Sequence, residues 1–197
     1  AAKSLNATYI TETWDLWPYC FATSGLLRED SLLMKLFYKI ERAIYSRAVR
    51  NIFTIAGCKQ YLKDHKWDKE QGGPIDLKHV YYINNGIDLD DFERFKKDFQ
   101  LDIPELKDPK TFKVLYLGSV SHINGVNSII ETARLFKDEQ NVSFLIFGDG
   151  TEREELEQKV KKEEITNVHF LNKWVEIKYV PYIISCSDIN LLNYIRA

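Results

Sequence analysis

Three loops in the second half of the sequence carry polar residues, two of them together with glycine, a pattern that suits the binding of an anion. They are GSVSHING (118–125), GDG (148–150) and NKWV (172–175). The first precedes a run with helical periodicity, and a helix N-terminus presents unpaired N–H groups and about half a positive charge. A diphosphate leaving as an anion would be stabilised there, and Gly118 and Gly125 would let the backbone approach it closely. Glycine after a strand is also an ordinary turn residue, so the loop by itself leaves both roles open.

The elements that would position these loops alternate between strand and helix. We expect strands at 113–118, 142–147, 167–171 and 188–194. We also expect a helix at 125–138 that buries Val126, Ile129, Ile130, Ala133 and Phe136, a charged helix opened by a Thr151–Glu154 capping box, and a short helix starting at Pro181. Continuous apolar strands that alternate with helices predict a parallel α/β sheet. Open sheets of this kind bind ligands at the carboxyl ends of their strands, where the three loops lie.

The first half of the sequence predicts a second unit of similar construction. Strands are expected at 7–12, 51–56 and 79–83, and helices at 30–48, capped by Asp30 or Ser31, and at 57–65. The longer helix carries an apolar stripe formed by Leu32, Leu33, Leu36, Phe37, Ile40 and Ile44. Asn85 and Gly86 indicate a tight turn, because both tolerate positive φ. The charged stretch from 92 to 111 indicates a junction, so we predict domains at 1–95 and 112–197 with a linker at 96–111.

Composition restricts the function classes. The 197 residues are 45% hydrophobic and 28% charged with a net charge of −2, so no nucleic-acid partner is expected. Cys20, Cys58 and Cys186 form no CxxC or Cys/His cluster, which favours reduced thiols in the cytoplasm. No apolar run approaches the length of a membrane span, and the first residues are too polar for a signal peptide. The absence of GxGxxG argues against a Rossmann dehydrogenase.

Several segments, in their order, resemble a known family. FKVLYLGSVSHINGVNSIIETARLF, VSFLIFGDG, NVHFLNKW and VPYIISCSDINLL look like the nucleotide-binding C-terminal domain of family-4-type GT-B glycosyltransferases. DLWP (15–18) resembles a motif of the family's N-terminal domain, and YINNGIDLDDF (82–92) resembles its N-G-x-D-x-x-x-F domain crossover. The resemblance covers residues 7–194. It implies an α/β fold of the GT-B kind, with two Rossmann-like parallel-sheet domains that are both incomplete in this chain.

The resemblance also implies a reaction. Such enzymes transfer a sugar from a nucleoside diphosphate to an acceptor hydroxyl with retention at the anomeric carbon, and they need no metal or other cofactor. The expected partners are a nucleotide-diphosphate sugar and a saccharide or lipid-linked saccharide acceptor. The DLWP element points to the assembly of bacterial surface or capsular polysaccharide, in the cytoplasm or at the inner membrane. Because the family's first strands and its E-x7-E segment are absent, this chain alone is expected to lack turnover.

The donor site can be transferred from the family only in part. Gly118 and Gly125 match its phosphate loop, where many members carry an Arg after the first glycine and a Lys before the second. Here these positions are Ser119 and Asn124, so two cationic contacts are missing. His122 lies within the loop and could supply one charge. The alternative is an exposed loop histidine without that role.

Four further residues are candidates for nucleotide binding. Gly148 and Asp149 occupy the second loop at the expected ligand edge. Lys173 and Trp174 match the segment that often contacts the base in the family. Trp174 has a second interpretation as a core residue.

Candidates on the acceptor side lie in the first half. Trp14 stands where many relatives have a histidine that faces the donor sugar. Asp15 is either an acceptor-side polar group or a cap of the following turn, and Glu12 is a candidate of the same kind. Trp14 and Trp17 either stack on a sugar or belong to the core. Asn85 and Gly86 are expected to shape the interdomain crossover, with a role in lining the cleft as second choice.

Two alternatives remain open. The missing Arg and Lys favour a rival in which the protein is a non-catalytic homologue that binds a sugar nucleotide or glycan. Lys35, Lys39 and Arg42 share one helix face, which suits either peripheral contact with an anionic membrane or simple solvation.

Overall fold

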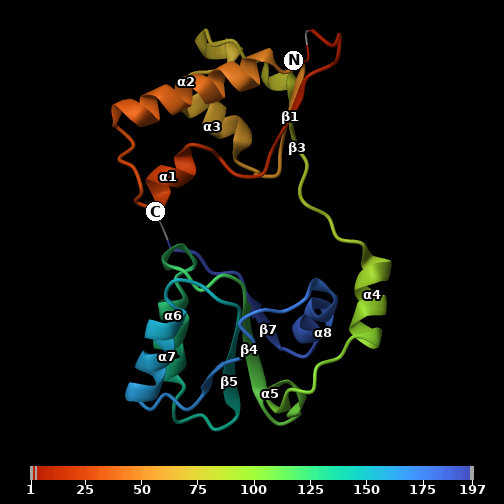
Figure 1. Cartoon of the computed structure of the whole chain (residues 1–197), viewed down its shortest axis with the longest axis vertical. Coiled ribbons are helices and arrows are strands. Elements are labelled where there is room, and N and C mark those ends of the chain that lie inside the picture. The colour runs from red at the N-terminus through yellow and green to blue at the C-terminus, as the bar shows by residue number, and fades with distance from the viewer. Residues whose placement is uncertain (1, 3, 196–197) are drawn as a thin grey trace. The chain divides into compact units, whose positions relative to one another are not determined.

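The chain forms two compact units. The computed structural model describes residue 2 and residues 4–195, and it divides the chain into Ala1–Gly86 and Ile87–Ala197 (Figure 1). Each unit contains its own parallel sheet and its own buried clusters of apolar side chains. No helix among the described residues is long and apolar enough to cross a membrane.

The first unit is built on a three-stranded parallel sheet in the order β1-β2-β3. The strands are β1 (Ile10–Thr13), β2 (Arg50–Phe53) and β3 (Val80–Tyr82), and the helices are α1 (Tyr19–Thr23), α2 (Leu32–Arg47) and α3 (Cys58–Asp64). Ser31 caps α2, because its Oγ accepts a hydrogen bond from the N–H of Met34 at 3.2 Å. The predicted strands and helices of this half are therefore confirmed, with ends that differ by a few residues.

The face of α2 that packs inward overlaps only in part with the predicted one. Its buried residues are Met34, Glu41 and Tyr45, whereas Leu32 is 85% exposed and Leu36 is 52% exposed. The ring of Tyr45 joins Phe53 of β2 in the core of the unit. Ile44 of the predicted stripe packs against this core and Phe37 packs on Trp17, so the prediction is confirmed for these two residues and wrong for the leucines and Ile40.

The second unit is built on a four-stranded parallel sheet in the order β6-β5-β4-β7. Its strands are β4 (Phe112–Leu117), β5 (Val142–Phe147), β6 (Val168–Phe170) and β7 (Ile189–Leu191). Its helices are α4 (Leu89–Asp98), α5 (Pro104–Lys107), α6 (Val126–Leu135), α7 (Arg153–Lys162) and α8 (Val180–Ser185). The expected succession of strand and helix is confirmed, and Pro181 lies in the first turn of α8.

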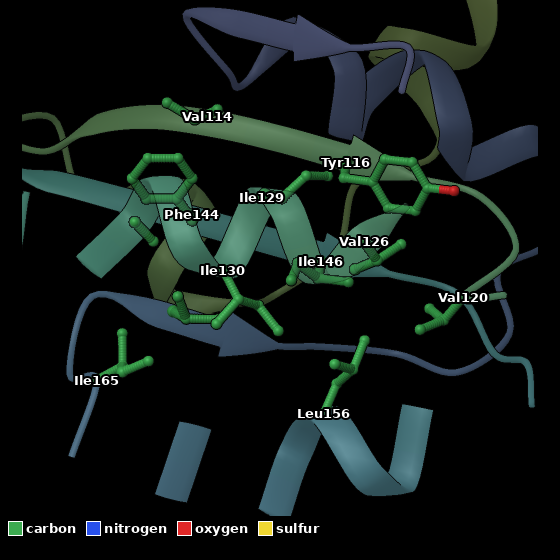
Figure 2. Close-up of a cluster of buried hydrophobic side chains, with 12 residues drawn as sticks. Val114, Tyr116, Val120, Val126, Ile129, Ile130, Phe144, Ile146, Leu156 and Ile165 are labelled. Atoms are coloured by element: carbon green, nitrogen blue, oxygen red, sulfur yellow. The ribbon is translucent and has the colours of Figure 1, made fainter. Parts of the chain in front are cut away.

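Side chains that alternate along β4 and β5 separate the core of the second unit into two layers. Val114, Tyr116, Phe144 and Ile146 face α6 and α7 (Figure 2), and Leu115, Leu145 and Phe147 face α5 and α8. Figure 1 shows α6 and α7 on one side of the sheet and α8 on the other. The result is a three-layer arrangement of helices, sheet and helices.

The segment predicted as a linker belongs to the second unit. The division falls after Gly86, not within 96–111. Leu106 of α5 is buried, and Leu101 and Ile103 pack against the same cluster as Leu115 and Ile183. A proline and two charged residues of this stretch lie in the short helix α5 and are not buried. They do not mark a flexible junction.

Two local predictions are wrong. Residues 83–88 form no turn, and neither Asn85 nor Gly86 has a positive φ. Asp88 then begins α4, since its side chain accepts hydrogen bonds from the N–H groups of Asp90 and Asp91. Phe136 ends α6 and is 40% exposed, whereas Val126, Ile129, Ile130 and Ala133 are buried as expected.

Candidate functional site

The predicted ligand loops of the second unit meet at one edge of its sheet. Residues 118–125 follow β4, 148–152 follow β5, 171–176 follow β6 and 192–195 follow β7. All four strands are parallel, so their carboxyl ends lie on the same side. Successive connections run outward from β4 through β5 to β6, and the chain then returns to place β7 on the other side of β4. This is the switch point at which open α/β sheets bind ligands.

The beginning of the 118–125 loop is fixed by hydrogen bonds to β4, β5 and the loop after β5. The hydroxyl of Tyr116 donates a hydrogen bond to the carbonyl of Ser119 at 2.7 Å. The N–H of Gly118 donates to Phe147 O at 3.0 Å, and the N–H of Val120 donates to Asp149 O at 2.9 Å. Burial raises the pKa of the Tyr116 hydroxyl, so this group remains a proton donor. The loop therefore has a defined path before any ligand arrives.

Gly148 and Gly150 are required by the neighbouring loop. A Cβ on Gly148, whose φ is +122°, would lie 1.9 Å from the carbonyl oxygen of Gly118. A Cβ on Gly150 would lie 2.3 Å from the carbonyl oxygen of Val120. The two glycines thus allow the 148–150 loop to lie directly against the 118–120 backbone. Their presence has a packing explanation, and the assignment of Gly148 and exposed Asp149 to nucleotide binding stays a prediction.

Arg153 holds this edge together and escaped the sequence analysis. It is 3% exposed, and its guanidinium donates to the carbonyls of Gly148 and of Leu171, the latter at 2.7 Å, and to Glu157 Oε1 at 2.6 Å. The capping box predicted from Thr151 and Glu154 does not form. An arginine in the first turn of a charged helix gives no sequence signal of burial, because such residues usually face solvent.

At the start of α6, at the switch point, two backbone N–H groups lack a partner in the described part of the chain, one on the buried Val126 and one on the exposed Asn127. Gly125 has a φ of +56°, and its carbonyl accepts a hydrogen bond from Asn193 Nδ2 at 2.9 Å. The N–H of Ser128 donates back to Gly125 O. The N–H groups of Val126 and Asn127 have no partner among the described residues. Such groups are the anion-binding element of a helix N-terminus.

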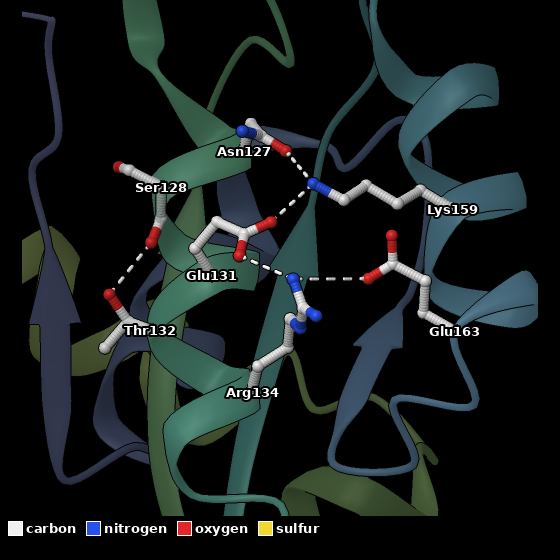
Figure 3. A network of polar contacts seen from close by, with 7 residues as sticks. All are labelled: Asn127, Ser128, Glu131, Thr132, Arg134, Lys159 and Glu163. Atoms are coloured by element: carbon white, nitrogen blue, oxygen red, sulfur yellow. Dashed lines mark hydrogen bonds and ion pairs between the residues drawn. The ribbon is translucent and has the colours of Figure 1, made fainter.

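A cavity of about 500 Å³ adjoins this helix start. Its lining includes His122, Gly125, Asn127, Glu152, Lys159 and Ile195. Lys159 Nζ donates to Asn127 Oδ1 at 2.6 Å and to Glu131 Oε1 at 2.5 Å, which ties α7 to α6 (Figure 3). The same figure shows Arg134 joining Glu131 to Glu163. Lys159 thus brings a cation to the helix start, although Glu131 neutralises part of its charge.

The remaining loop candidates are positioned as follows. The side chain of His122 is 78% exposed, and its Nδ1 lies 3.4 Å from Glu152 Oε1. Asn124, which stands where relatives have a lysine, accepts a hydrogen bond from the Ser121 hydroxyl at 2.6 Å. Ser119 offers its carbonyl to Tyr116 and brings no charge to the loop.

The core interpretation of Trp174 is wrong. Its ring is 76% exposed, and the neighbouring Lys173 is exposed as well. Both side chains lie on the loop after β6, and the carbonyl of Asn172 in that loop accepts a hydrogen bond from the N–H of Gly148. The loop thereby places an aromatic ring and a cation at the same edge as the start of α6.

The first unit gathers its predicted acceptor-side residues around a separate pocket of about 430 Å³. Its lining includes Glu12, Trp14, Asp15, Trp17, Glu41 and Tyr45. The core interpretation of Trp14 is wrong, because this ring is 66% exposed, whereas Trp17 packs on Phe37 with ring centroids 5.0 Å apart. The side chain of Asp15 does not cap α1. Asn85 and Gly86 do not line this pocket and lie, exposed, at the end of the unit.

Comparison with known families assigns the second unit. Residues 98–195, which span nearly all of it, match the family model described as glycosyl transferases group 1. Over these residues the second unit is similar to the group 1 glycosyl transferases. The "Probable glycosyltransferase WbjE" of Pseudomonas aeruginosa is 22% identical to the chain over 171 residues, which cover 86% of the chain and 40% of that relative. The chain therefore spans less than half the length of the curated relative it matches.

Solved glycosyltransferase structures share the fold. HepE from Anabaena, solved in complex with UDP, aligns with a TM-score of 0.63 at 17% identity over 96% of the chain and 47% of HepE. WaaG, described as a glycosyltransferase involved in lipopolysaccharide biosynthesis, aligns with a TM-score of 0.63 at 14% identity over 98% of the chain and 55% of WaaG. These similarities confirm the predicted fold class, the GT-B fold with Rossmann-like parallel sheets, and the family-4 subtype stays a prediction.

Proposed function

We propose that the chain is part of a retaining, family-4-type glycosyltransferase that transfers a sugar from a nucleoside diphosphate to an acceptor hydroxyl. The supporting observation is the free N–H of the exposed Asn127, next to that of the buried Val126, at the switch point of a sheet whose sequence matches the group 1 glycosyl transferases. A departing diphosphate develops negative charge, and fixed N–H donors stabilise that charge without reorganising. Gly118 and Gly125 let this loop pack closely, since a Cβ on Gly118 would lie 3.0 Å from the Tyr116 hydroxyl and one on Gly125 would lie 3.0 Å from Ile195.

The other donor contacts are assigned by position. His122, on the loop before α6, would approach the phosphates, and the exposed ring of Trp174 with Lys173 would approach the base. We propose that catalysis needs no metal, since the helix start supplies the stabilisation of the leaving group. HepE has been solved with UDP and with UDP-glucose, which makes uridine the first base to test here.

The acceptor is proposed to be a saccharide or a lipid-linked saccharide in bacterial polysaccharide assembly. The description of WaaG, which concerns lipopolysaccharide, supports this assignment. The proposed location is the cytoplasm, with peripheral contact at the inner membrane. The exposed Lys35, Lys39 and Arg42 of α2, together with exposed Leu32 and Leu36, support that contact because basic and apolar side chains suit an anionic bilayer surface.

A specific observation favours the non-catalytic alternative. Ser119 and Asn124 bring no charge to the phosphate loop, and Lys159, a cation that lies at the start of α6, is paired with Glu131. A diphosphate would then gain less electrostatic stabilisation than in relatives with an Arg and a Lys. Such a protein would bind a sugar nucleotide or glycan without transferring the sugar.

Calorimetry with UDP, GDP, UMP and uridine tests the proposal. We expect a diphosphate to bind more tightly than its monophosphate and nucleoside, because the diphosphate reaches the free N–H groups. Equal affinities for UDP and uridine, or no binding of any nucleotide, would contradict it. We expect no turnover from this chain, which spans 40% of its curated relative. Sugar transfer by the longer protein separates the enzyme from the non-catalytic alternative.

A further inference from the structure

The sequence contains two Asn-Gly pairs, and the structure gives them opposite surroundings. They are Asn85–Gly86, in the segment after β3, and Asn124–Gly125, directly before α6. In such a pair the backbone nitrogen of the glycine can attack the side-chain Cγ of the asparagine, because glycine has no Cβ in the way and leaves the backbone free to rotate. Whether the attack occurs therefore depends on how firmly the structure holds each pair.

The described residues leave the Asn85–Gly86 pair unrestrained. Residues 83–88 are exposed and form no helix, strand or turn. Among the described residues, the peptide group between Asn85 and Gly86 and the Asn85 side chain make no hydrogen bond. A Cβ placed on Gly86 would meet nothing within 4 Å. The side chain and the peptide that follows it are both free to rotate into the geometry of attack.

Hydrogen bonds hold the Asn124–Gly125 pair on every side. The carbonyl of Asn124 accepts from Asn193 Nδ2 at 2.9 Å, and the N–H of Gly125 donates to His122 O at 2.9 Å. The side chain of Asn124 accepts from the Ser121 hydroxyl at 2.6 Å. A Cβ on Gly125 would lie 3.1 Å from Asn193 Nδ2, so the surroundings are crowded as well. These contacts must open before the glycine nitrogen can reach the side chain.

We propose that Asn85 is a site of spontaneous deamidation and that its contacts protect Asn124 from the same reaction. The Gly86 nitrogen gives its proton to solvent base and bonds to Cγ of Asn85, and the side-chain nitrogen leaves as ammonia, which forms a cyclic succinimide. Water then opens the ring to aspartate or isoaspartate. One asparagine and one water thus become one carboxylic acid and one ammonia, without an oxidant or an enzyme. The proposal does not rest on the proposed function.

The modification changes the boundary between the two units, which falls after Gly86. It adds a negative charge at residue 85, and in the isoaspartate form it inserts the side-chain CH2 into the main chain. The same reaction at Asn124 would place that charge beside the start of α6, where it would repel an anion. Protection of Asn124 therefore keeps the loop before α6 uncharged while residue 85 changes with age.

Peptide mass spectrometry on the aged chain tests the proposal. The folded chain is incubated in isotopically labelled water at mildly alkaline pH and digested in ordinary water, so labelled oxygen marks only deamidation during the incubation. Cleavage after Lys and Arg places Asn85 in peptide 79–94 and Asn124 in peptide 114–134. We expect Asn85 to be labelled at least ~10-fold faster than Asn124, which corresponds to about 1.4 kcal/mol of protection.

The unfolded chain and matched variants show that the structure sets the difference. In urea, which removes the contacts of the folded chain, the two sites should be labelled at rates within about threefold of each other. Asn193→Ala removes the donor to the Asn124 carbonyl and should raise labelling of Asn124 at least ~3-fold without changing Asn85. Asn190→Ala is the control, since the Asn190 side chain bonds within the 184–190 segment and not to this pair.

Three results would overturn the proposal. Asn85 that is labelled in urea but not in the folded chain would show that the fold restrains it. Equal rates at Asn85 and Asn124 in the folded chain would show that the contacts of Asn124 give no protection. A folded Asn193→Ala variant with an unchanged rate at Asn124 would show that the contact to Asn193 is not protective. Circular dichroism establishes folding, and the comparison of buffer with urea carries the test if this variant is unfolded.

Discussion

At the residue scale, two buried charged side chains differ in how fully their polar atoms are paired. Arg153 donates to two carbonyls and to Glu157, so burial of its charge is compensated. Glu41 accepts a hydrogen bond from the Tyr61 hydroxyl, and the groups around it are the hydroxyls of Tyr38, Tyr45 and Tyr61. Burial of Glu41 without a cation disfavours its ionised form. Its protonation should therefore control the stability of the chain.

We expect Glu41 to make stability fall as pH rises. Its pKa increases from an ordinary 4.5 to about 7 in the folded chain, which therefore holds the proton more tightly than the unfolded chain. This contribution is fully present below about pH 4.5 and is lost as pH rises to about 7. The loss amounts to about 3 kcal/mol. Urea unfolding of the wild type and Glu41→Gln from pH 4.5 to 8 measures it.

The Glu41→Gln variant provides its own reference, because glutamine does not titrate. We expect the difference in unfolding free energy between variant and wild type to grow in favour of the variant across this window. A difference that stays constant with pH would show that Glu41 titrates with an ordinary pKa.

His122 should contribute to diphosphate affinity and not to nucleoside affinity. His122→Ala removes an exposed side chain beside the start of α6, so we expect UDP to bind about two- to fivefold more weakly, the size of an exposed ionic contact. The affinity for uridine should not change. His79→Ala is the matched control, since His79 is exposed and lies in the first unit. Unchanged UDP affinity in calorimetry would remove His122 from the site.

At the element scale, contact between loops shapes the ligand edge of the second unit. The 118–120 backbone packs against Gly148 and Gly150, and the Tyr116 hydroxyl donates a hydrogen bond to it. Arg153 in turn donates to the carbonyl of Gly148. Asn193 and Ile195, after β7, extend these contacts to Asn124, Ile123 and Gly125. The start of α6 is therefore held in place by three neighbouring loops.

Gly148→Ala should destabilise the second unit by at least ~2 kcal/mol, because a positive φ is combined with a backbone clash. The added Cβ would lie 1.9 Å from Gly118 O, and backbone cannot move aside as a side-chain end can. Gly57→Ala is the matched control, since a Cβ there meets nothing within 4 Å and φ is −76°. Chemical denaturation measures both. Equal effects of the two substitutions would contradict the contact.

Helix α2 should respond to charge reversal when the chain binds membranes. Its Lys35 and Lys39 are exposed beside apolar Leu32 and Leu36. Lys35→Glu/Lys39→Glu should weaken binding to phosphatidylserine-containing vesicles at least ~10-fold, because each basic residue near such a surface contributes about 1 kcal/mol. Vesicle sedimentation measures the effect. Lys110→Glu/Lys137→Glu is the control, and an equal loss in that variant would indicate attraction unrelated to α2.

At the scale of the whole molecule, the chain consists of two units with separate cores. The core of the first unit gathers around Phe53 and Leu62, and that of the second gathers on both faces of β4 and β5. Each unit also has its own candidate site. The proposed nucleotide edge of the second unit and the pocket beside β1 are therefore open to separate measurement.

Calorimetric unfolding should show that the two units respond separately to substitution. Ile75→Val in the first core and Ile130→Val in the second each remove one buried methylene, which costs roughly 0.5–1.5 kcal/mol. Each should lower one of two thermal transitions and leave the other in place. A single transition that both variants shift equally would show that the units unfold together.

The periodic parts of the fold were predictable because buried strands and helices repeat over many residues. The strand–helix succession of the second unit and the buried face of α6 follow directly from that repetition. The structure of the 96–111 segment could not be predicted in this way. Leu101, Ile103 and Leu106 all join a core, but these three apolar residues are scattered among charges and show no periodicity. The prediction that the leucines of α2 are buried failed for the opposite reason, since their spacing is periodic but their side chains are exposed.

The sequence by itself determined the parallel α/β units, the glycine loops at strand ends and the resemblance to glycosyltransferases. These features depend on neighbours along the chain or on spacings that repeat. Only the tertiary structure decided that Arg153 is buried beneath the loops, that Gly148 faces the Gly118 carbonyl and that Glu41 faces a pocket. Each of these depends on a contact between segments far apart in sequence, and the burial of a charged residue follows from its surroundings in space and not from its type.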